Sequence, residues 1–583
     1  MRLRYLHLKN YPPINDIKVC FASGSPLARE CAIRFVVGVN GSGKSNLLRA
    51  VAEVFLALSD LRVSAFPVNL VYELGIRGKT NHRTLLLHCP GGRKKASLWI
   101  RERFFFEDHT KQDIFDVFFE QLSKAGKPND SAFIPLIEPG NWPLRDSTPP
   151  QIALPTAVLA YTTGDLRPWR SVWNRNQDSE DFLENSEDVL NDERPAGWTI
   201  EQEKSFQLSQ QASEDSARDQ FGSIRADTVQ FRRPILLDTT LLKCALLAVS
   251  LSQSFKVQSD VKNSLDTLLT SGGWHKLISV AFRSHLQTDN WSESLCETAH
   301  DWWLCASDVV SEPHPFEQRR TLYFDINNSF NNQGVSFVSA SQRELKNSDS
   351  HGEALLSLLG GSAGENTKPF DVFTHLLELK RAGLFEDVLL RIRRNTAPEP
   401  NDEDINDDIG ILRYEELSDG EQMVLGRMAL FHLFHGQQDT LLLLDEPETH
   451  FNDRWKREIV DIIDDAIGRT SNDVLISTHS AIVLSDVFNN EIVMVQKTDK
   501  GSHVIPVNEP TFATDPSALM MTVFEAEDSI GKRAQEYIEE KLKQVKGTPE
   551  EISDLEQLIS RMGSGFYRSE LRTLLNSWRG ENA

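Results

Sequence analysis

Short apolar runs and amphipathic stretches alternate along this chain, and their spacing predicts its elements. Four mostly apolar runs are typical of strands buried on both faces of a parallel sheet: 32–37, 157–161, 440–445 and 474–477. Apolar residues three and four positions apart predict a helix from Leu47 to Leu58 and another from Trp455 to Ala466. Further strand-like runs occupy 1–11, 85–88 and 98–101. Strands that alternate with helices predict an α/β fold.

Shifts in composition divide the chain into four parts, with boundaries at 1–173, 174–400, 401–510 and 511–583. The first and third parts hold the apolar runs. The second begins with a polar, acidic segment to residue 228, which is typical of a surface insertion. Its remaining residues predict helices over 235–310, strands over 320–340 and an acidic loop over 396–410. The last part predicts three amphipathic helices, one of which begins with the capping-box pattern of Thr548 and Glu551.

The link between the first buried run and its helix reads VVGVNGSGKSNL at 36–47, and it fits G-x-x-x-x-G-K-[ST]. A strand before this motif and a helix after it are the context in which the motif indicates a phosphate-binding loop. Glycines let backbone N–H groups converge on phosphate oxygens, and a helix N-terminus favours an anion. Lys44 can reach the β- and γ-phosphates, and Ser45 can ligate Mg²⁺. The predicted nucleotide-binding residues are Asn40, Gly41, Ser42, Gly43, Lys44, Ser45 and Asn46.

Two carboxylates, Asp445 and Glu446, end the apolar run at 440–445. Asp445 can hold Mg²⁺ together with Ser45, and Glu446 is placed to polarise an attacking water. Two acids can also merely end an ordinary strand, but the phosphate loop elsewhere in the chain favours the catalytic interpretation. His479 follows the next buried run, and a strand–helix–strand order would bring it beside the γ-phosphate.

A helix start lies just upstream, at Leu417-Ser418-Asp419-Gly420-Glu421-Gln422. Ser418 is in the position of an N-cap residue, which is a purely structural role. The alternative is that this helix N-terminus and the Ser418 hydroxyl face a phosphate.

The order of phosphate loop, long insertion, LSDGEQ, LLLLDEPE and STHS resembles the ABC-type ATPase family, within it the SMC-like and overcoming-lysogenization-defect-like branch. This resemblance implies an ABC-ATPase-type head, an α/β fold with a mixed β-sheet flanked by helices. It also implies a mainly helical insertion at 174–400 and a helical C-terminal tail. In such heads ATP and Mg²⁺ bind the phosphate loop, Glu446 is catalytic and His479 is the switch histidine.

The same resemblance implies an assembly. LSDGEQ corresponds to the signature motif, so Ser418, Gly420 and Glu421 would contact nucleotide bound to another subunit, and two chains would pair head to tail as a homodimer or within a larger oligomer. Residues 1–173 and 401–510 would form the N- and C-terminal lobes of the head. The chain departs from the family at Asp419, in place of a glycine, and at Asn452, in place of the D-loop aspartate. No glutamine can be assigned to the Q-loop, and the turn TTGD at 162–165 lies in that region.

The tail and the insertion indicate which process such an ATPase would serve. The insertion has no sustained heptad pattern, which argues against a long-armed machine. The strand followed by YTTG and the tail GSGFYRSELRTLL resemble the ATPase subunits of Septu-type antiphage systems, the PtuA family, which also occur in retrons. That resemblance implies a partner HNH nuclease (PtuB-like), and in retrons a reverse transcriptase with its RNA–DNA hybrid. Residues 511–583 would then be a docking module.

Two alternatives stay open at this point. A self-contained ATP-dependent nuclease would use the acidic cluster of Glu525, Glu527 and Asp528, although that cluster also suits a helix N-terminus. An SMC-like ATPase would clamp DNA, and basic clusters such as Arg391, Arg393 and Arg394 could follow a phosphate backbone.

Charge and cysteine content narrow the classes of function. The formal net charge of −23 argues against non-specific DNA binding over the whole surface. The six cysteines form no C-x-x-C pair, so we expect reduced thiols and no structural zinc site. No apolar run approaches the length needed to cross a bilayer, and the first residues alternate as in a strand. The sequence therefore predicts a cytoplasmic protein with no membrane partner.

Overall fold

The computed structural model describes most of the 583 residues. The described residues are 1–21, 31–60, 62–91, 95–107, 112–128, 130–138, 153–174, 233–255, 274–285, 291–313, 318–326, 337–338, 344–345, 348, 350–362, 364, 367–394, 411–467, 470–498, 501–524, 530–543, 548–563 and 565–581. The predicted acidic segment at 174–228, apart from residue 174, and the loop at 396–410 lie outside them.

A seven-stranded sheet forms the centre of the molecule, in the order β20-β19-β3-β18-β17-β8-β9. Its strands are β3 (Ala32–Val37), β8 (Ala157–Thr162), β9 (Ile235–Leu236), β17 (Thr440–Asp445), β18 (Asp473–Ser477), β19 (Ile492–Thr498) and β20 (Gly501–Ile505). All neighbours are parallel except β19 and β20. The four apolar runs of the sequence are four adjacent strands, which confirms those predictions. Because these strands are parallel, their carboxyl ends meet at one edge.

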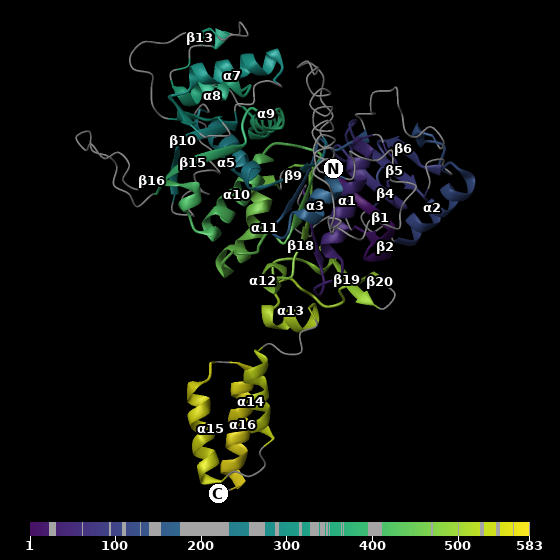
Figure 1. The fold of residues 1–583 in the computed structure, drawn as a ribbon. Coiled ribbons are helices and arrows are strands. Elements are labelled where there is room, and N and C mark those ends of the chain that lie inside the picture. Colours follow the sequence, from purple (N-terminus) through teal and green to yellow (C-terminus); the bar gives the residue numbers. More distant parts are fainter. Residues whose placement is uncertain are drawn as a thin grey trace, which may run out of the picture.

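The first face of this sheet packs on α1 (Lys44–Ser59), which lies between two sheets (Figure 1). The second sheet is antiparallel, in the order β2-β1-β4-β5-β6-β7. Its strands are β1 (Arg2–Tyr11), β2 (Ile14–Cys20), β4 (Val68–Leu74), β5 (Arg83–Cys89), β6 (Ser97–Glu102) and β7 (Ile134–Ile137). On its far side α2 (Gln112–Ala125) buries Phe115, Phe119 and Leu122. Helix α1 is buried along nearly its whole length, so its first turn is firmly placed.

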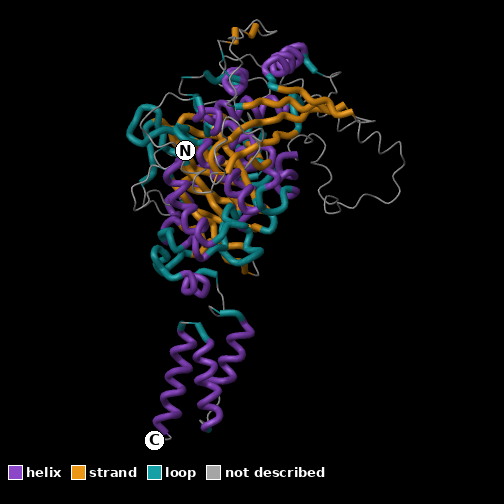
Figure 2. Tube along the Cα trace, turned by 90° about the vertical axis from the view of Figure 1, so that its left-hand side faces the viewer, coloured by secondary structure: helices purple, strands orange, loops and turns teal. Residues whose placement is uncertain are grey.

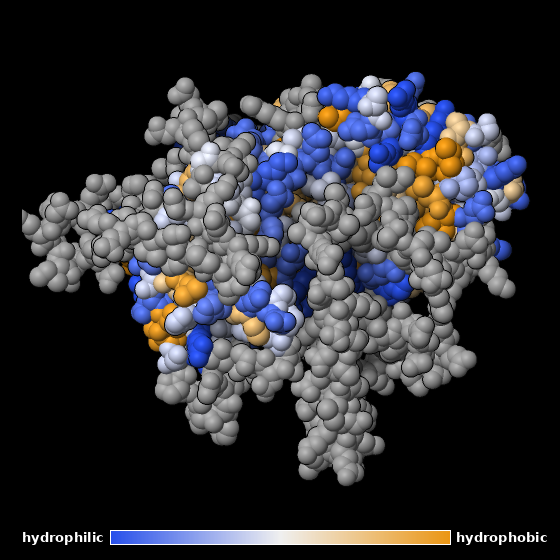
Figure 3. Space-filling model, turned by 90° about the horizontal axis from the view of Figure 1, so that it is seen from above, coloured by the Kyte–Doolittle hydropathy of each residue, from blue (hydrophilic) through white to orange (hydrophobic). Residues whose placement is uncertain are grey.

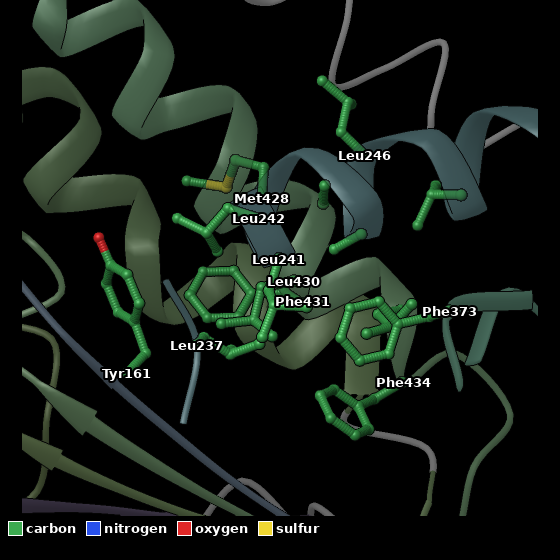
Figure 4. Packing of buried hydrophobic residues seen from close by; sticks show 14 of the residues in the cluster. Tyr161, Leu237, Leu241, Leu242, Leu246, Phe373, Met428, Leu430, Phe431 and Phe434 are labelled. Atoms are coloured by element: carbon green, nitrogen blue, oxygen red, sulfur yellow. The ribbon is translucent and has the colours of Figure 1, made fainter. Parts of the chain in front are cut away.

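The opposite face of the central sheet packs on α10 (Asp419–Leu433), α11 (Asp453–Ile467) and α5 (Thr239–Ser254). Helix α5 comes from the insertion, yet Leu242 and Leu246 lie among side chains of α10 such as Met428 (Figure 4). Gly426 of α10 makes this approach close: a Cβ atom there would lie 3.2 Å from Cβ of Leu242. The helix α9 (Pro369–Arg381) completes this layer with Phe373.

The insertion also contains a five-stranded antiparallel sheet, in the order β11-β12-β10-β15-β16. Its strands are β10 (Trp274–His285), β11 (Asp308–Pro313), β12 (Gln318–Asp325), β15 (Asp387–Arg394) and β16 (Ile411–Arg413). The prediction of helices throughout 235–310, and of a mainly helical insertion, is therefore corrected: β10 and β11 are strands. In β10, Val280 and Phe282 belong to the main hydrophobic core, whereas Arg283 does not, and the buried small residues Ser279 and Ala281 blur this period of two in the sequence.

Shorter elements complete the insertion and the head. They are α3 (Arg167–Asn174), α7 (Glu293–Cys305), β13 (Phe337–Val338), β14 (Glu344–Leu345), α8 (His351–Leu358), η4 (Tyr414–Glu416), α12 (Ala481–Leu484), η5 (Asn489–Glu491) and α13 (Pro516–Thr522). Among the described residues that are visible from above, hydrophilic ones are the more widespread, and hydrophobic ones gather in a few groups (Figure 3). All six cysteines are free thiols.

Three helices form the C-terminal part, as the sequence predicts: α14 (Lys532–Leu542), α15 (Pro549–Arg561) and α16 (Phe566–Glu581). They enclose a core of their own, made by Ile538, Leu555, Ile559, Leu571, Leu575 and Trp578. Thr548 caps α15, and Glu551 completes the capping box. The three helices stand together as a separate group in Figures 1 and 2.

Candidate nucleotide-binding site

The phosphate loop joins β3 to α1 through glycines in the left-handed region of backbone space. Gly38, Gly41 and Gly43 have φ values of 151°, 78° and 100°. A Cβ atom on Gly38 would lie 2.1 Å from the carbonyl oxygen of Val495, so only glycine fits there. The N-terminus of α1 has no side-chain cap and no acid in its first turn. Its N–H groups and dipole therefore suit an anion, which fits the predicted role of residues 40–46.

Lys44 begins α1 and is held at the mouth of this loop. Its ammonium group donates to the carbonyl oxygens of Gly38 at 2.9 Å and Val39 at 3.4 Å. Burial lowers the pKa of Lys44, and the nearby carboxylates of Glu446 and Asp445 oppose that shift. A cation bonded only to backbone carbonyls can exchange them for phosphate oxygens without breaking an ion pair.

The Asp445 carboxylate accepts hydrogen bonds from three hydroxyl groups. Ser45 donates to Oδ1 at 2.8 Å, Ser477 donates to the same oxygen, and Thr162 donates to Oδ2 at 3.1 Å. The structure thus brings Ser45 and Asp445 together from opposite ends of the chain. A hydroxyl and a carboxylate are the protein ligands that Mg²⁺ takes beside nucleotide phosphates, so this donor set fits the ion.

Glu446 and His479 form a hydrogen-bonded pair at the edge of the site. Nδ1 of His479 lies 3.0 Å from Oε1 of Glu446. This bond lowers the pKa of Glu446 and raises the pKa of His479. Glu446 has a φ of 51°, a strained conformation for a residue with a side chain, and its N–H donates to the carbonyl of Ser477 at 3.0 Å. The two predicted catalytic side chains are therefore in contact.

A pocket of about 250 Å³ opens beside these groups. It is lined by Ser45, Arg49, Thr162, Thr163, Gly164, Asp165, Pro168, Trp169, Asp445 and Glu446. The TTGD turn is thus part of the site: the Thr163 hydroxyl donates to the carbonyl of Glu446 at 3.1 Å. Thr162 and Thr163 were not predicted as site residues. Their position at the carboxyl end of a buried strand was a signal for them.

The LSDGEQ segment lies elsewhere. Ser418 is the N-cap of α10: its hydroxyl accepts from the N–H of Glu421 at 3.3 Å, and a carboxylate oxygen of Glu421 accepts from the N–H of Ser418 at 2.9 Å. Arg394 lies 3.4 Å from Glu421, and a Cβ atom on Gly420 would lie 3.6 Å from the carbonyl oxygen of His450. None of Ser418, Gly420 and Glu421 lines the pocket.

Asn452, which stands where the resemblance would place the D-loop aspartate, caps a helix. Asn452 precedes α11 and its side-chain oxygen accepts from the N–H of Trp455 at 2.9 Å, which is the bond of a helix cap. Asparagine makes this bond as well as aspartate does.

The second acidic cluster cannot be placed, because Glu525, Glu527 and Asp528 lie outside the described residues. Elsewhere in the described chain, His, Cys, Asp and Glu side chains form no group of three or more that could hold a metal. None of the described helices is both long and apolar enough to cross a membrane.

Part of the chain is similar to a known protein family. Residues 296–486 match the family model described as "AAA domain, putative AbiEii toxin, Type IV TA system". The matched residues include α10, β17 and β18 but not the phosphate loop. A search of curated proteins finds no match.

Several solved structures are similar at low identity. The SMC head domain from Thermotoga maritima has 12% identity over 87% of this chain and 100% of that chain, with a TM-score of 0.27. An Smc head bound to the C-winged helix domain of ScpA has 13% identity over 87% of this chain and 98% of that chain, with a TM-score of 0.30. The Smc head with an extended coiled coil from Pyrococcus furiosus, bound to the C-terminal domain of ScpA, has 11% identity over 86% and 95%, with a TM-score of 0.27.

TM-scores this low do not establish a shared fold, so the assignment depends on the family match and on the geometry of the site. The α/β architecture has its sheets flanked by helices, and the matched segment supplies Asp445, Glu446 and His479 to the phosphate loop of β3 and α1. Residues 296–486 of the chain are therefore similar to an AAA domain, and the phosphate loop of β3 and α1 lies outside the matched segment.

Proposed function

We propose that the protein binds and hydrolyses ATP at the phosphate loop. The observation that carries this proposal is the convergence of Ser45, Asp445 and Glu446 on one pocket beside the open N-terminus of α1. The N–H groups of residues 40–46 would hold the phosphates, and Lys44 would turn from the loop carbonyls to the β- and γ-phosphates. Mg²⁺, held by Ser45 and Asp445, supplies charge neutralisation on the phosphate oxygens.

Glu446 would orient and deprotonate the attacking water. Its pKa is lowered by the hydrogen bond from His479, so the carboxylate is ionised and able to accept a proton at neutral pH. His479, whose pKa is raised by the same bond, would hold Glu446 in place and present a positive charge toward the γ-phosphate.

A second copy of the chain would complete the site. Ser418, Gly420 and Glu421 do not line the pocket of their own chain, and they lie at the N-terminus of α10, where the resemblance to an ABC-type signature motif would place the phosphate of another chain's nucleotide. Two chains arranged head to tail would place each segment on the other chain's ATP. ATP would then close the dimer, and hydrolysis would release it.

We further propose that this ATPase is the sensor subunit of a cytoplasmic antiphage defence complex, and that it controls a partner HNH nuclease. The PtuA-like features of the sequence and the toxin–antitoxin description of the matched family support this. The helices α14–α16 supply a docking module: they have their own core, and Tyr537 and Phe566 are 50% and 69% exposed. The nucleic-acid partner would be a retron RNA–DNA hybrid, bound together with its reverse transcriptase, or target DNA.

Two substitutions test the ATPase itself. Lys44→Ala removes the phosphate cation and should abolish ATP binding, measured with a fluorescent ATP analogue. Glu446→Gln keeps the shape of the side chain but removes the base, so ATP binding should persist while hydrolysis stops and the dimer accumulates in size-exclusion chromatography with ATP. Hydrolysis by Glu446→Gln at the wild-type rate would refute the role of Glu446.

A pull-down from the native host tests the complex. The tagged full-length chain should retain an HNH nuclease, and the double variant Tyr537→Glu/Phe566→Glu should lose it. Lys532→Glu, an exposed change on α14, should keep it. DNA cleavage by the protein alone, lost on Glu525→Ala and Asp528→Ala, would favour the self-contained nuclease. ATP-dependent and salt-sensitive DNA retention without a nuclease would favour the SMC-like clamp.

A further inference from the structure

A second carboxyl group, Glu448, is buried directly behind the catalytic pair. It lies in the turn that follows β17 and is 2% exposed. One of its oxygens accepts a hydrogen bond from the hydroxyl of Thr478. The other is buried and has no hydrogen-bond partner among the described residues. A buried carboxyl oxygen without a hydrogen-bond partner is costly, so this group calls for an explanation.

Thr478 ties three parts of the site together. It is fully buried, and its N–H donates to the carbonyl of Val36 in β3 at 3.1 Å. Its hydroxyl donates to Glu448 and also accepts from the N–H of Ser480 at 3.0 Å. His479 therefore lies between two residues whose backbone is fixed, although its own side chain is 52% exposed.

The turn that carries Glu448 is fixed from the other side by Arg427. This guanidinium is fully buried on α10 and donates to the carbonyl of Pro447 and to that of Thr449, the latter at 2.7 Å. These two carbonyls flank Glu448 in the chain. Glu448 thus has a rigid backbone from which to hold Thr478.

Glu446 and Glu448 differ in their access to the pocket. Glu446 lines it and has a lowered pKa, whereas Glu448 does not line it and burial raises its pKa. A group with no path to the reacting atoms cannot serve as a second base. It can act only through a residue that has such a path.

We propose that Glu448 is a positioning residue, which holds Thr478 and thereby places His479 against Glu446. This inference rests on the proposed ATPase function of the same site. It explains why a carboxyl group is buried here: its acceptor oxygen fixes the turn between β18 and α12. The nearest charged groups that act on His479 are Glu446, Glu448 and Lys44.

Three variants separate this role from its alternatives. Thr478→Val keeps the shape of the side chain but removes the hydroxyl. Glu448→Gln keeps an acceptor oxygen, whereas Glu448→Ala removes it. Thr511→Val is the matched control, because Thr511 is equally buried and its hydroxyl donates at 2.6 Å to the carbonyl of Val487 outside the site.

Steady-state ATP hydrolysis is the first readout. Residues that orient a reacting group typically contribute about 10- to 100-fold to activity, so Thr478→Val and Glu448→Ala should lower kcat by at least about tenfold. KM should change by less than about threefold, since neither side chain reaches the nucleotide. Glu448→Gln and Thr511→Val should stay within about threefold of the wild-type kcat. Wild-type kcat in Thr478→Val, or Glu448→Gln as inactive as Glu446→Gln, would overturn the proposal.

The second readout needs no hydrolysis. The pKa of His479, measured by NMR on the nucleotide-free protein with ¹⁵N-labelled histidine and assigned with His479→Gln, reports the contact with Glu446. It should be raised in the wild type and in Thr511→Val, and should fall toward the ordinary histidine value in Thr478→Val. An unchanged pKa in Thr478→Val would overturn the positioning role. If the wild type itself hydrolyses no ATP, the proposed function fails, and this measurement alone decides whether the bond between Thr478 and Glu448 places His479 against Glu446.

Discussion

Replacing Thr162 by valine removes one of the three hydroxyl groups that hold the Asp445 carboxylate. Valine is β-branched like threonine and can take the same rotamer, so the buried end of β8 should keep its backbone position. Oδ2 of Asp445 then loses its donor at 3.1 Å, while Oδ1 keeps those from Ser45 and Ser477. The carboxylate is then held through Oδ1 alone, so its orientation is less restricted and it would hold Mg²⁺ less firmly.

The Thr162 hydroxyl also accepts from the N–H of Gly164 at 3.1 Å, but only its bond to Asp445 bears on the ion, and the expected magnitude follows from that bond. A hydrogen bond to a charged group contributes about 1.5–3 kcal/mol. Because two donors remain, we take the lower end, and about 1.4 kcal/mol corresponds to tenfold. The Mg²⁺ concentration that gives half-maximal ATP hydrolysis should therefore rise about tenfold in Thr162→Val, with a smaller change in the rate at saturating Mg²⁺.

The assay is ATP hydrolysis over a Mg²⁺ titration at fixed total ATP. Thr440→Val is the matched control: Thr440 is fully buried at the start of the neighbouring strand β17, and its hydroxyl donates to Asn472 at 2.8 Å. It lies roughly 17 Å along the strand from Asp445, given a rise of about 3.3 Å per residue. An unchanged Mg²⁺ requirement in Thr162→Val, or an equal shift in Thr440→Val, would refute this account of Asp445.

Two further predictions concern stability. Asp473→Ala should lower the free energy of unfolding by about 3–5 kcal/mol in urea titrations, because it removes the carboxylate that lies 2.7 Å from the buried guanidinium of Arg34 and that accepts from the N–H of Leu3. The double variant Arg34→Met/Asp473→Leu should recover most of this loss, and a loss below about 1 kcal/mol in Asp473→Ala would contradict the prediction. Burial lowers the pKa of His88 to about 4 in the folded protein, whereas the pKa of histidine in the unfolded chain is about 6.5. As the pH falls, His88 therefore takes up its proton in the unfolded chain first. The stability that is present above pH 6.5 is lost as the pH falls toward 4. His88 should account for about 2 kcal/mol of destabilisation between pH 7 and pH 5, and a His88→Gln variant with an unchanged pH dependence would show that His88 is not responsible.

The parts of the molecule that the sequence predicted share one property: their pattern was unambiguous within a few residues. The strand β17 is leucine on both faces and ends in acids, so both its place in a parallel sheet and the position of Asp445 followed from local sequence. The strand β10 has alanine and serine among its apolar residues, and its period of two emerges only when it pairs with β12 and β15.

The missed site residues have a different cause. Thr162, Thr478 and Arg427 are ordinary residue types, and each bonds to a partner at least 20 positions away in the sequence. Ser45 and Asp445 were paired in advance only because their motifs specify a shared ion. The hydrogen bonds of Thr162, Thr478 and Arg427 belong to no such motif, so they can be identified only in the folded structure.

The close contact at Gly426 bears on any attempt to reduce this protein to a minimal ATPase. A shortened chain that joins residue 173 to residue 401 would keep every motif of the pocket, yet it would strip α5 from α10 and expose the apolar side of the helix that carries Arg427. The turn around Glu448 depends on that arginine. We therefore expect that deleting the insertion would disturb the head. A shortened protein that keeps the site would need another helix in place of α5, with a residue of the size of Leu242 facing Gly426.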